Sequence, residues 1–377
     1  MKEKSFDNIC THLADDAYRV AGAIIPPLFL TSLFTEKNKE TPYSYSRVTN
    51  PTLEPVEKKI TAMEDGAWTR CFASGMAAIT TAILANCKSG DHIVCVQNAY
   101  SGLQGLAKHQ LKNYGITVTY VDGKRIDAMT NAITEATKIL YLESPSSVIF
   151  DMTDIEAACS MAHARDIMVL MDNTWATPLY QNPIRYGVDL VIHSCTKYMG
   201  GHSDLIAGSI TGKDPWTESA VLQARTDFGN AITPHQAWLL MRGLRTLPLR
   251  MRQHRESGML FYNGIKNHPA IAKIFFPGAD NYAQTELVDK YLSGTVGLMS
   301  FCIRGSFDRV RTALKTLSYF EEGCSWGGFE SLFIMLEPKE YLFDMVEGEF
   351  ALVRVSVGLE DIHTLIDDFN QALDRLV

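Results

Sequence analysis

Between Ala67 and Gly212 the chain alternates short apolar runs with longer stretches in which apolar residues recur at helical spacing, and this alternation limits the fold more than any other feature. Such a rhythm is typical of βα units built around a largely parallel sheet. The predicted strands are 68–72, 92–96, 116–121, 138–142, 167–171 and 188–192, and the predicted helices between them are 75–86, 101–114, 125–136 and 153–165. We expect the helices to cover the faces of the sheet.

The character of the sequence changes after Pro234. A long, mostly helical stretch over 234–267 is predicted to contain a domain junction. Beyond it we expect a smaller α+β unit with strands near 271–276, 298–303 and 351–357 and a last amphipathic helix that begins at Glu360. Residues 1–50 are interrupted by prolines and have no apolar pattern for a core of their own. The predicted division is therefore an arm over 1–50, a large domain over 51–240 and a small C-terminal domain over 241–377.

Composition excludes several functional classes. The 377 residues include 35 Lys and Arg against 43 Asp and Glu, a formal charge of −8, whereas nucleic-acid-binding proteins carry a basic excess. The longest apolar runs fall well short of the roughly 18 residues that a membrane span needs. The eight cysteines form no CxxC pair, so we expect free, buried thiols and a cytoplasmic location. The ten histidines lack metal-binding spacing, and we expect no metal site.

The segment 189–203 is the most informative part of the sequence. Its apolar run ends in the hydroxyl residues Ser194 and Thr196, which are followed by Lys197 and a pair of glycines. A lysine at the end of a buried strand can be desolvated and activated for Schiff-base formation. The alternative is a lysine whose stem covers apolar surface while its amine reaches water. Lys197 alone does not decide between them.

Three other strand ends add to this candidate site. Asp172 follows four apolar residues and could hold a pyridine nitrogen protonated, although it could also be a helix N-cap. At 74–76 a strand gives way to a helix whose first N–H groups would suit a phosphate, although a structural cap reads equally well. Tyr100 could stack on a planar ring or simply pack. With Ser194 and Thr196, these residues predict a phosphate cup, a ring platform, an acid and an amine.

At these residues the chain resembles the pyridoxal-phosphate enzymes of cysteine and methionine metabolism. The match over 189–203 is long, and the similarity continues through segments 43–52, 74–76, 172–176, 242–247 and 358–361. The resemblance implies an α/β protein with the fold type I, aspartate-aminotransferase-like architecture of PLP-dependent transferases. In that architecture a large, mostly parallel sheet domain binds the cofactor and a smaller C-terminal α+β domain completes the site.

The same resemblance implies roles for individual residues. Pyridoxal 5'-phosphate would be bound covalently by Lys197, with Asp172 at its ring nitrogen. Tyr100 would stack on the ring and take part in catalysis. The implied phosphate ligands are Gly75, Met76, Ser194 and Thr196 from the same chain and Tyr45 and Arg47 from a neighbouring subunit. A homodimer with shared active sites, doubled to a homotetramer, follows from the resemblance.

Within the family, segment 324–331 resembles cystathionine β-lyases, because relatives tend to carry Leu where Trp326 stands. Arg354 matches the arginine that binds the substrate carboxylate, and Ser325 would assist it through its backbone. The expected reaction is β-elimination of L-cystathionine to homocysteine, pyruvate and ammonia in transsulfuration and methionine biosynthesis. Segment 143–148 lacks an asparagine common in the family, and the residues after Tyr100 differ from Gly-Gly-Thr. Other cysteine S-conjugates and γ-lyase or γ-synthase chemistry therefore stay open.

Rival functions rest on shorter patterns. Segment 323–327 fits the G-x-S-x-G motif of serine hydrolases around Ser325, with Asp361 and His363 in the right chain order, but the residues after it indicate a strand instead of the required helix. Ser194 and Lys197 fit S-x-x-K without the accompanying motifs of penicillin-binding enzymes. A protein that keeps this fold for regulation alone would not need the amine, acid and arginine together.

Overall fold

The structure is a computed structural model that describes residues 5–35, 37, 41–338 and 340–377, and it contains two sheets. The larger sheet has seven strands in the spatial order β1 (Trp68–Phe72), β7 (Gly208–Gly212), β6 (Leu190–His193), β5 (Met168–Asp172), β4 (Thr137–Glu143), β2 (His92–Val96) and β3 (Thr117–Val121). Strands β6, β5, β4, β2 and β3 run parallel, and β7 is antiparallel to both β1 and β6. The predicted α/β fold with a largely parallel sheet is confirmed.

The interior strands form where the sequence is continuously apolar. Every residue of β2 and β6 is buried, as expected for parallel strands covered on both faces. Strand β7 was not predicted, because a strand bounded by two glycines has weak strand propensity. Gly208 is required there, since a side chain at this position would overlap the carbonyl oxygen of Ser74. Packing against the next loop, not propensity, therefore determines this strand.

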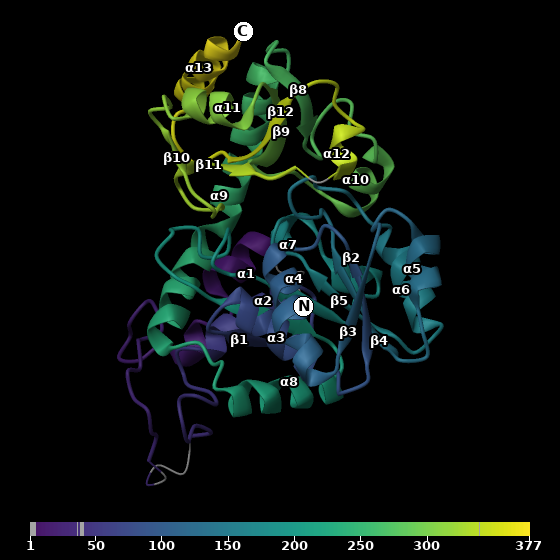
Figure 1. Cartoon of the computed structure of the whole chain (residues 1–377). Helices are drawn as coiled ribbons and strands as arrows, with labels where there is room; N and C mark the ends of the chain where they lie inside the picture. Colours follow the sequence, from purple (N-terminus) through teal and green to yellow (C-terminus); the bar gives the residue numbers. More distant parts are fainter. Residues whose placement is uncertain (1–4, 36, 38–40, 339) are drawn as a thin grey trace.

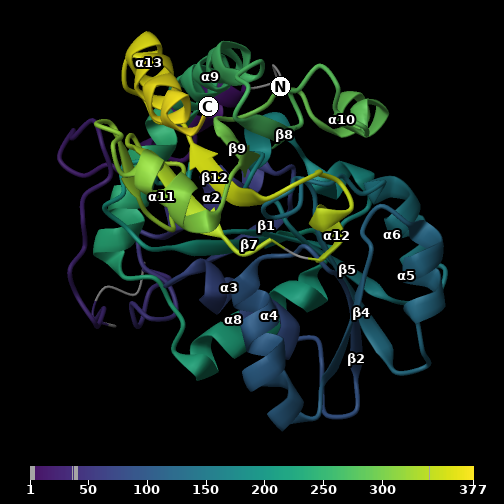
Figure 2. The ribbon, with the colours of Figure 1, turned by 45° about the horizontal axis from the view of Figure 1, so that its top comes forward.

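Helices follow the strands where the spacing predicts them. The connecting helices are α3 (Gly75–Leu84), α4 (Ser101–His109), α5 (Ile126–Ala132) and α6 (Ile155–His163), and α5 is shorter than predicted. Helices α2 (Glu54–Met63), α7 (Thr177–Tyr180) and α8 (Pro215–Phe228) complete this part of the molecule. Helix α3 contacts both α4 and α8, and Figure 2 shows the three side by side.

One helix connects the two sheets. Helix α9 (Pro234–Ile265) has 32 residues and begins with a capping box between Thr233 and Gln236. Its first half contributes residues such as Leu244 to the core of the larger sheet, and its last turns contribute Phe261 to the core of the smaller one (Figure 1). No helix within the described ranges is long and apolar enough to cross a membrane.

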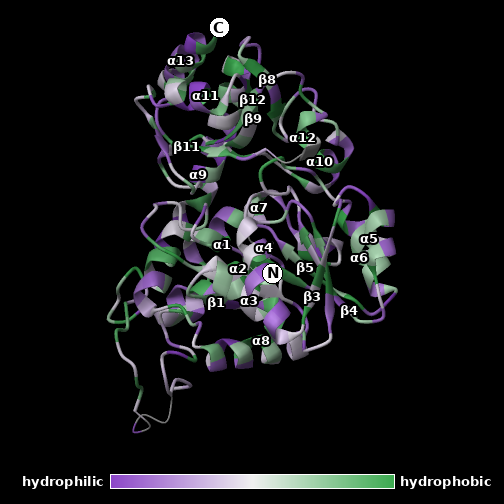
Figure 3. Cartoon of the chain, in the orientation of Figure 1, coloured by the Kyte–Doolittle hydropathy of each residue, from purple (hydrophilic) through white to green (hydrophobic). Residues whose placement is uncertain are grey.

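The smaller sheet has the spatial order β10 (Phe320–Glu322), β11 (Ser331–Leu336), β12 (Phe350–Ser356), β9 (Leu298–Arg304) and β8 (Ile271–Phe275). Neighbouring strands are antiparallel except for β10 and β11. The accompanying helices are α10 (Thr285–Tyr291), α11 (Phe307–Leu314), α12 (Glu340–Phe343) and α13 (Ile362–Leu373). Figure 3 shows both hydrophilic and hydrophobic residues on α13, which packs its apolar face on the sheet. The predicted strands and last helix of the α+β unit are confirmed, whereas the domain limits stay a prediction.

The N-terminal region divides into two parts. Helix α1 (Phe6–His12) packs on α2 and α9, and Asp15 forms a buried ion pair of 3.0 Å with Lys59. The following segment leaves the body of the molecule as a long loop (Figure 1), with 74% of Leu30 exposed. Whether this loop contacts a neighbouring subunit stays a prediction.

The expectation that all cysteines are buried is wrong for two of them. Cys87 is partly exposed and Cys324 is exposed, while the other six are buried and none forms a disulfide. Cys324 lies on the loop between β10 and β11, where it borders a cavity instead of a core.

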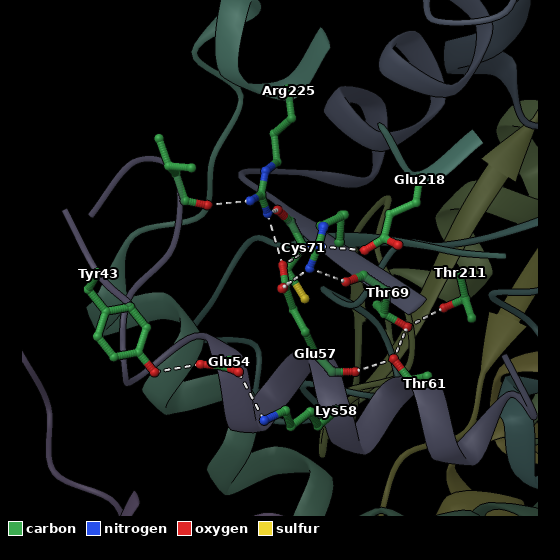
Figure 4. A network of polar contacts seen from close by, with 12 residues as sticks. Tyr43, Glu54, Glu57, Lys58, Thr61, Thr69, Cys71, Thr211, Glu218 and Arg225 are labelled. Carbon is green, nitrogen blue, oxygen red and sulfur yellow. Dashed lines mark hydrogen bonds and ion pairs between the residues drawn. The ribbon is translucent and has the colours of Figure 1, made fainter. Parts of the chain in front are cut away.

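A buried charged network joins the end of the N-terminal loop to the larger sheet (Figure 4). Glu57 accepts hydrogen bonds of 2.9 Å from Arg225, from Arg70 and from the backbone N–H of Cys71. Arg225, which is 1% exposed, also donates to the carbonyl oxygen of Val48 at 2.6 Å. The network therefore fixes the backbone next to Arg47 relative to α2, α8 and β1.

Replacing Glu57 by Gln is expected to lower the free energy of unfolding by about 3 kcal/mol, because the buried Arg225 would lose its counter-ion. Urea denaturation at fixed protein concentration measures the change. The control is Asp65→Asn, which removes the carboxylate from an exposed pair with Arg185 and should cost less than about 1 kcal/mol. Equal losses in the two variants would contradict the interpretation.

Candidate active site

A cavity of about 340 Å³ lies at the carboxyl ends of β4, β5 and β6, beneath the smaller sheet. Ten residues with predicted roles line it: Gly75, Met76, Tyr100, Asp172, Ser194, Thr196, Lys197, Ser325, Trp326 and Arg354. Tyr45 and Arg47 do not line it. The first seven lie on the strands, helices and loops around the larger sheet, and the last three lie on β12 and the loop before β11, so the cavity is completed only where the two parts pack together.

Lys197 lies just after β6, with its amine inside the cavity. The Nζ atom donates a hydrogen bond of 2.9 Å to Ser325 Oγ and lies 5.5 Å from the ring centre of Trp326. Burial, and then the positive charge of Arg354, lower the pKa of Lys197. The lowered pKa increases the fraction of free amine, which is the nucleophilic and basic form.

Asp172 ends β5 and forms the acidic side of the cavity. Its carboxylate accepts a hydrogen bond of 2.9 Å from the backbone N–H of Thr174. Burial raises the pKa of Asp172, and the hydrogen bonds of Thr174 oppose that rise. A cationic ring placed against this buried carboxyl group would stabilise its ionised form.

The first turn of α3 lies directly against the end of β6. Ser74 caps the helix by accepting a hydrogen bond of 3.0 Å from the N–H of Ala77. A Cβ atom at Gly75 would lie 2.8 Å from Ser194 Oγ, so glycine is needed for this close approach. The N–H groups of the first turn, together with the Ser194 and Thr196 hydroxyls, form a place suited to a phosphate.

Tyr100 stands at the start of α4, with 45% of its surface exposed. A side chain at Gly102 would overlap the Tyr100 ring and the Met76 sulfur, so the ring lies across the first turn beside Met76. The backbone N–H of Tyr100 donates to Glu143 at 2.7 Å. Glu143 also lines the cavity, yet the sequence analysis gave it no role. The signal was present, because Glu143 follows an apolar run just as Asp172 does.

Arg354 comes from the middle of β12. Its guanidinium donates to the carbonyl oxygen of Cys324 at 2.9 Å, and burial lowers its pKa to about 10, which leaves it charged at neutral pH. The neighbouring Ser325 and Trp326 lie on the loop before β11. Gly327 allows this loop to rest on Lys197, since its φ is +83° and a Cβ there would lie 2.8 Å from the N atom of Tyr198.

Comparison with known proteins identifies the family. The family described as Cys/Met metabolism PLP-dependent enzyme matches residues 8–374. The chain belongs to this family. Its cofactor is pyridoxal 5'-phosphate, and it shares the family's fold type I architecture.

Relatives with different names are similarly close to the chain. It is 34% identical to the cystathionine beta-lyase of Lactococcus lactis subsp. cremoris, over 95% of this chain and 96% of that protein. It is 32% identical to the L-methionine gamma-lyase of Pseudomonas deceptionensis, over 100% and 98% of the two chains. The cystathionine gamma-lyase of Lactobacillus plantarum, solved with L-serine, superposes with a TM-score of 0.91 at 32% identity and covers 98% of this chain and 99% of its own. The relatives therefore establish a PLP-dependent carbon–sulfur lyase family without separating its reactions.

The residues of the cavity fit the family's cofactor. A desolvated amine at Lys197 suits its aldehyde, the buried carboxyl of Asp172 suits its ring nitrogen, and the glycine-lined turn at Gly75 suits its phosphate. In this family member the individual roles stay predictions, although the geometry brings the residues together.

Tyr45 and Arg47 lie outside the cavity, on the exposed end of the N-terminal loop. The guanidinium carbon of Arg47 lies 5.6 Å from the centre of the Tyr45 ring, and the guanidinium donates to the carbonyl oxygen of Thr226. Both side chains are exposed, and the hydrogen bond from Arg225 to Val48 holds the backbone next to them.

The rival motifs lack the required geometry. Ser325 is followed by β11 and not by a helix. Asp361 instead caps α13 by accepting a hydrogen bond of 2.9 Å from Thr364, and His363 is exposed on that helix. The S-x-x-K lysine is hydrogen-bonded to Ser325 and not to Ser194.

Replacing Arg354 by Gln is expected to move the reaction of the apoprotein with pyridoxal phosphate to higher pH. Arg354 lowers the pKa of Lys197, so its removal raises that pKa, and the free amine then forms only at higher pH. Absorbance after mixing at a series of pH values gives the midpoint. Arg311→Gln, on an exposed surface pair, is the control and should leave the midpoint unchanged. A midpoint for Arg354→Gln at or below that of the control would refute the coupling.

Proposed function

We propose that this protein is a carbon–sulfur lyase that acts by β-elimination on L-cystathionine and releases homocysteine, pyruvate and ammonia. The observation that carries the proposal is the position of Trp326. Its ring lies beside the Lys197 amine, and the centres of the Trp326 and Tyr198 rings are 5.4 Å apart in an edge-on arrangement. A fixed indole narrows the space around the amine. Trp326 is also the residue that gives segment 324–331 its resemblance to cystathionine β-lyases, and this favours cleavage at Cβ over cleavage at Cγ.

The side chains divide the chemical work. Arg354 binds the substrate carboxylate through its planar guanidinium, and Tyr100 orients the reacting groups from the start of α4. The bound cofactor supplies an electron sink for the electrons released at Cα. Lys197 takes the Cα proton at its Nζ atom, because its lowered pKa increases the fraction of amine that is free to accept a proton. The Cβ–S bond then breaks, the sulfur keeps the bonding electrons and takes the proton held by Lys197 to leave as the thiol, and water converts the remaining fragment to pyruvate and ammonia.

A γ-lyase or γ-synthase reaction is the second candidate, because the same lysine can move protons for chemistry at Cγ. Segment 143–148 borders the cavity, and segment 101–103 follows the cavity residue Tyr100 in the chain. Both segments differ from the common family pattern. Cysteine S-conjugates other than cystathionine are further candidate substrates. A role in methionine biosynthesis and a cytoplasmic location belong to the same proposal.

The proposal includes a homodimer with shared active sites, assembled further into a homotetramer. The exposed Tyr45 and Arg47 do not line the cavity of their own chain, and the buried network of Glu57 and Arg225 holds the backbone next to them. A cationic and a phenolic side chain held in this way suit the phosphate in a partner's cavity.

Incubation of the purified holoprotein with L-cystathionine is expected to give pyruvate and homocysteine in equal amounts. Lys197→Ala should lower the rate at least about 10³-fold, because it removes the proton-transfer group. Lys124→Ala, at a partly exposed lysine in a surface ion pair, serves as the control with unchanged rate. Release of 2-oxobutyrate and cysteine instead would contradict β-elimination and assign γ-elimination to the same site.

Mixing subunits tests the shared active site. Lys197→Ala and Arg47→Ala are each expected to be nearly inactive, whereas dimers mixed at random from the two should regain about one quarter of the wild-type activity, since one of the two sites in each mixed dimer is intact. The control mixes Lys197→Ala with Asp172→Asn, whose defects lie in the same chain's cavity, and should regain nothing. Absence of recovery in the first mixture would exclude the shared site.

A further inference from the structure

Two carboxyl groups end neighbouring strands inside the cavity. Glu143 and Asp172 are the last residues of β4 and β5 and stand opposite each other in the register of the sheet. Both are buried. Within the described ranges neither forms an ion pair with a lysine or arginine. Asp172 faces the place predicted for a cationic ring, but the family's cofactor gives Glu143 no evident partner.

The contacts of Glu143 join two loops. Its Oε2 atom accepts from the backbone N–H of Tyr100 at 2.7 Å, and its Oε1 atom accepts from the hydroxyl of Ser147 at 2.6 Å. Tyr100 ends the loop after β2, and Ser147 lies in the loop after β4. The backbone N–H of Ser147 also donates to the carbonyl oxygen of Asn98 at 2.9 Å. These loops form two walls of the cavity.

The loop after β4 needs to be held in place. Val148 and Phe150 both line the cavity with φ angles of +73° and +56°. Bulky side chains rarely adopt this left-handed conformation, which persists only where surrounding contacts impose it. The bond from Ser147 to Glu143 is such a contact, one residue before Val148.

We propose that Glu143 is a positioning residue whose carboxyl group fastens Tyr100 to the loop at 144–150 and thereby sets the width of the cavity in which the cofactor ring and the substrate lie. The inference rests on the family's cofactor and on the predicted position of Tyr100 over its ring. It does not depend on which sulfur amino acid is cleaved.

The neighbouring charges indicate how Glu143 acts. Burial and the negative charge of Asp172 raise the pKa of Glu143 to about 8, whereas hydrogen bonds from Thr174 and the charge of His193 oppose the rise for Asp172. Burial beside the Asp172 carboxyl therefore favours the protonated form of Glu143. Glu143 accepts both hydrogen bonds, and the Ser147 hydroxyl can also act as an acceptor, so a side-chain amide could accept from the Tyr100 N–H and donate to Ser147 Oγ. A glutamine side chain can reproduce both bonds.

Three substitutions test the proposal in the holoprotein. Glu143→Gln is expected to keep kcat within about 3-fold of the wild type, because it keeps both hydrogen bonds. Glu143→Ala should lower kcat by about 10- to 100-fold, because loosened groups lose their alignment. Ser147→Ala, which removes one bond, should fall between the two and keeps the test available if Glu143→Ala does not fold.

Visible circular dichroism of the bound pyridoxal phosphate is the second measurement, because it reports the asymmetric surroundings of the ring without any turnover. The band should change in Glu143→Ala and Ser147→Ala and stay unchanged in Glu143→Gln. The matched control is Asp368→Asn, a buried carboxylate that accepts backbone N–H bonds in the smaller sheet's unit, which should leave the band unchanged.

Either of two results would overturn the proposal. One is a wild-type kcat and an unchanged band in Glu143→Ala or, if that variant does not fold, in Ser147→Ala. The other is a Glu143→Gln variant as impaired as Glu143→Ala, which would assign the effect to charge instead of the two hydrogen bonds. Failure of the β-lyase proposal would appear differently, as a normal cofactor band in a wild-type protein that does not cleave L-cystathionine.

Discussion

The site depends on the close approach of the first turn of α3 to the end of β6. Gly75 permits it on one side, and Gly208 permits β7 to pass the carbonyl group of Ser74 on the other. If the helix were displaced outward, its N–H groups would separate from the Ser194 hydroxyl and the phosphate cup would open. The carboxyl ends of β4, β5 and β6 then present their polar residues to one small volume, as parallel strands do in open α/β sheets.

Charges in the molecule are stabilised in two different ways. Around Glu57, the carboxylate is paired with the guanidinium groups of Arg225 and Arg70, so opposite charges lie together and stabilise the fold. In the cavity, the charged groups mostly bind neutral partners: Lys197 a hydroxyl, Asp172 a backbone N–H and Arg354 a carbonyl oxygen. Groups held in this way keep their capacity to interact with a ligand, and this distinguishes a site from a structural ion pair.

Much of this could be predicted from the sequence, for physical reasons. Continuous apolar runs identified the buried strands, and strand ends identified Asp172 and Lys197. Strand β7 was missed because packing against the loop at Ser74, and not strand propensity, determines where it forms. Nothing in local pattern brings Arg354 near Lys197, since the two come from different sheets and only the family resemblance connected them. Glu143 was missed because its partners, a backbone N–H and a serine, have no sequence pattern.

The continuity of α9 has a mechanical consequence. Because a single helix is embedded in both cores, the two sheets are not joined by a flexible linker, and a rigid-body movement of one sheet relative to the other would bend that helix. Pro248 lies within it and supplies no N–H to the helical hydrogen-bond ladder, so stiffness is lowest there. We therefore expect helix α9 to bend most easily at the turn that contains Pro248.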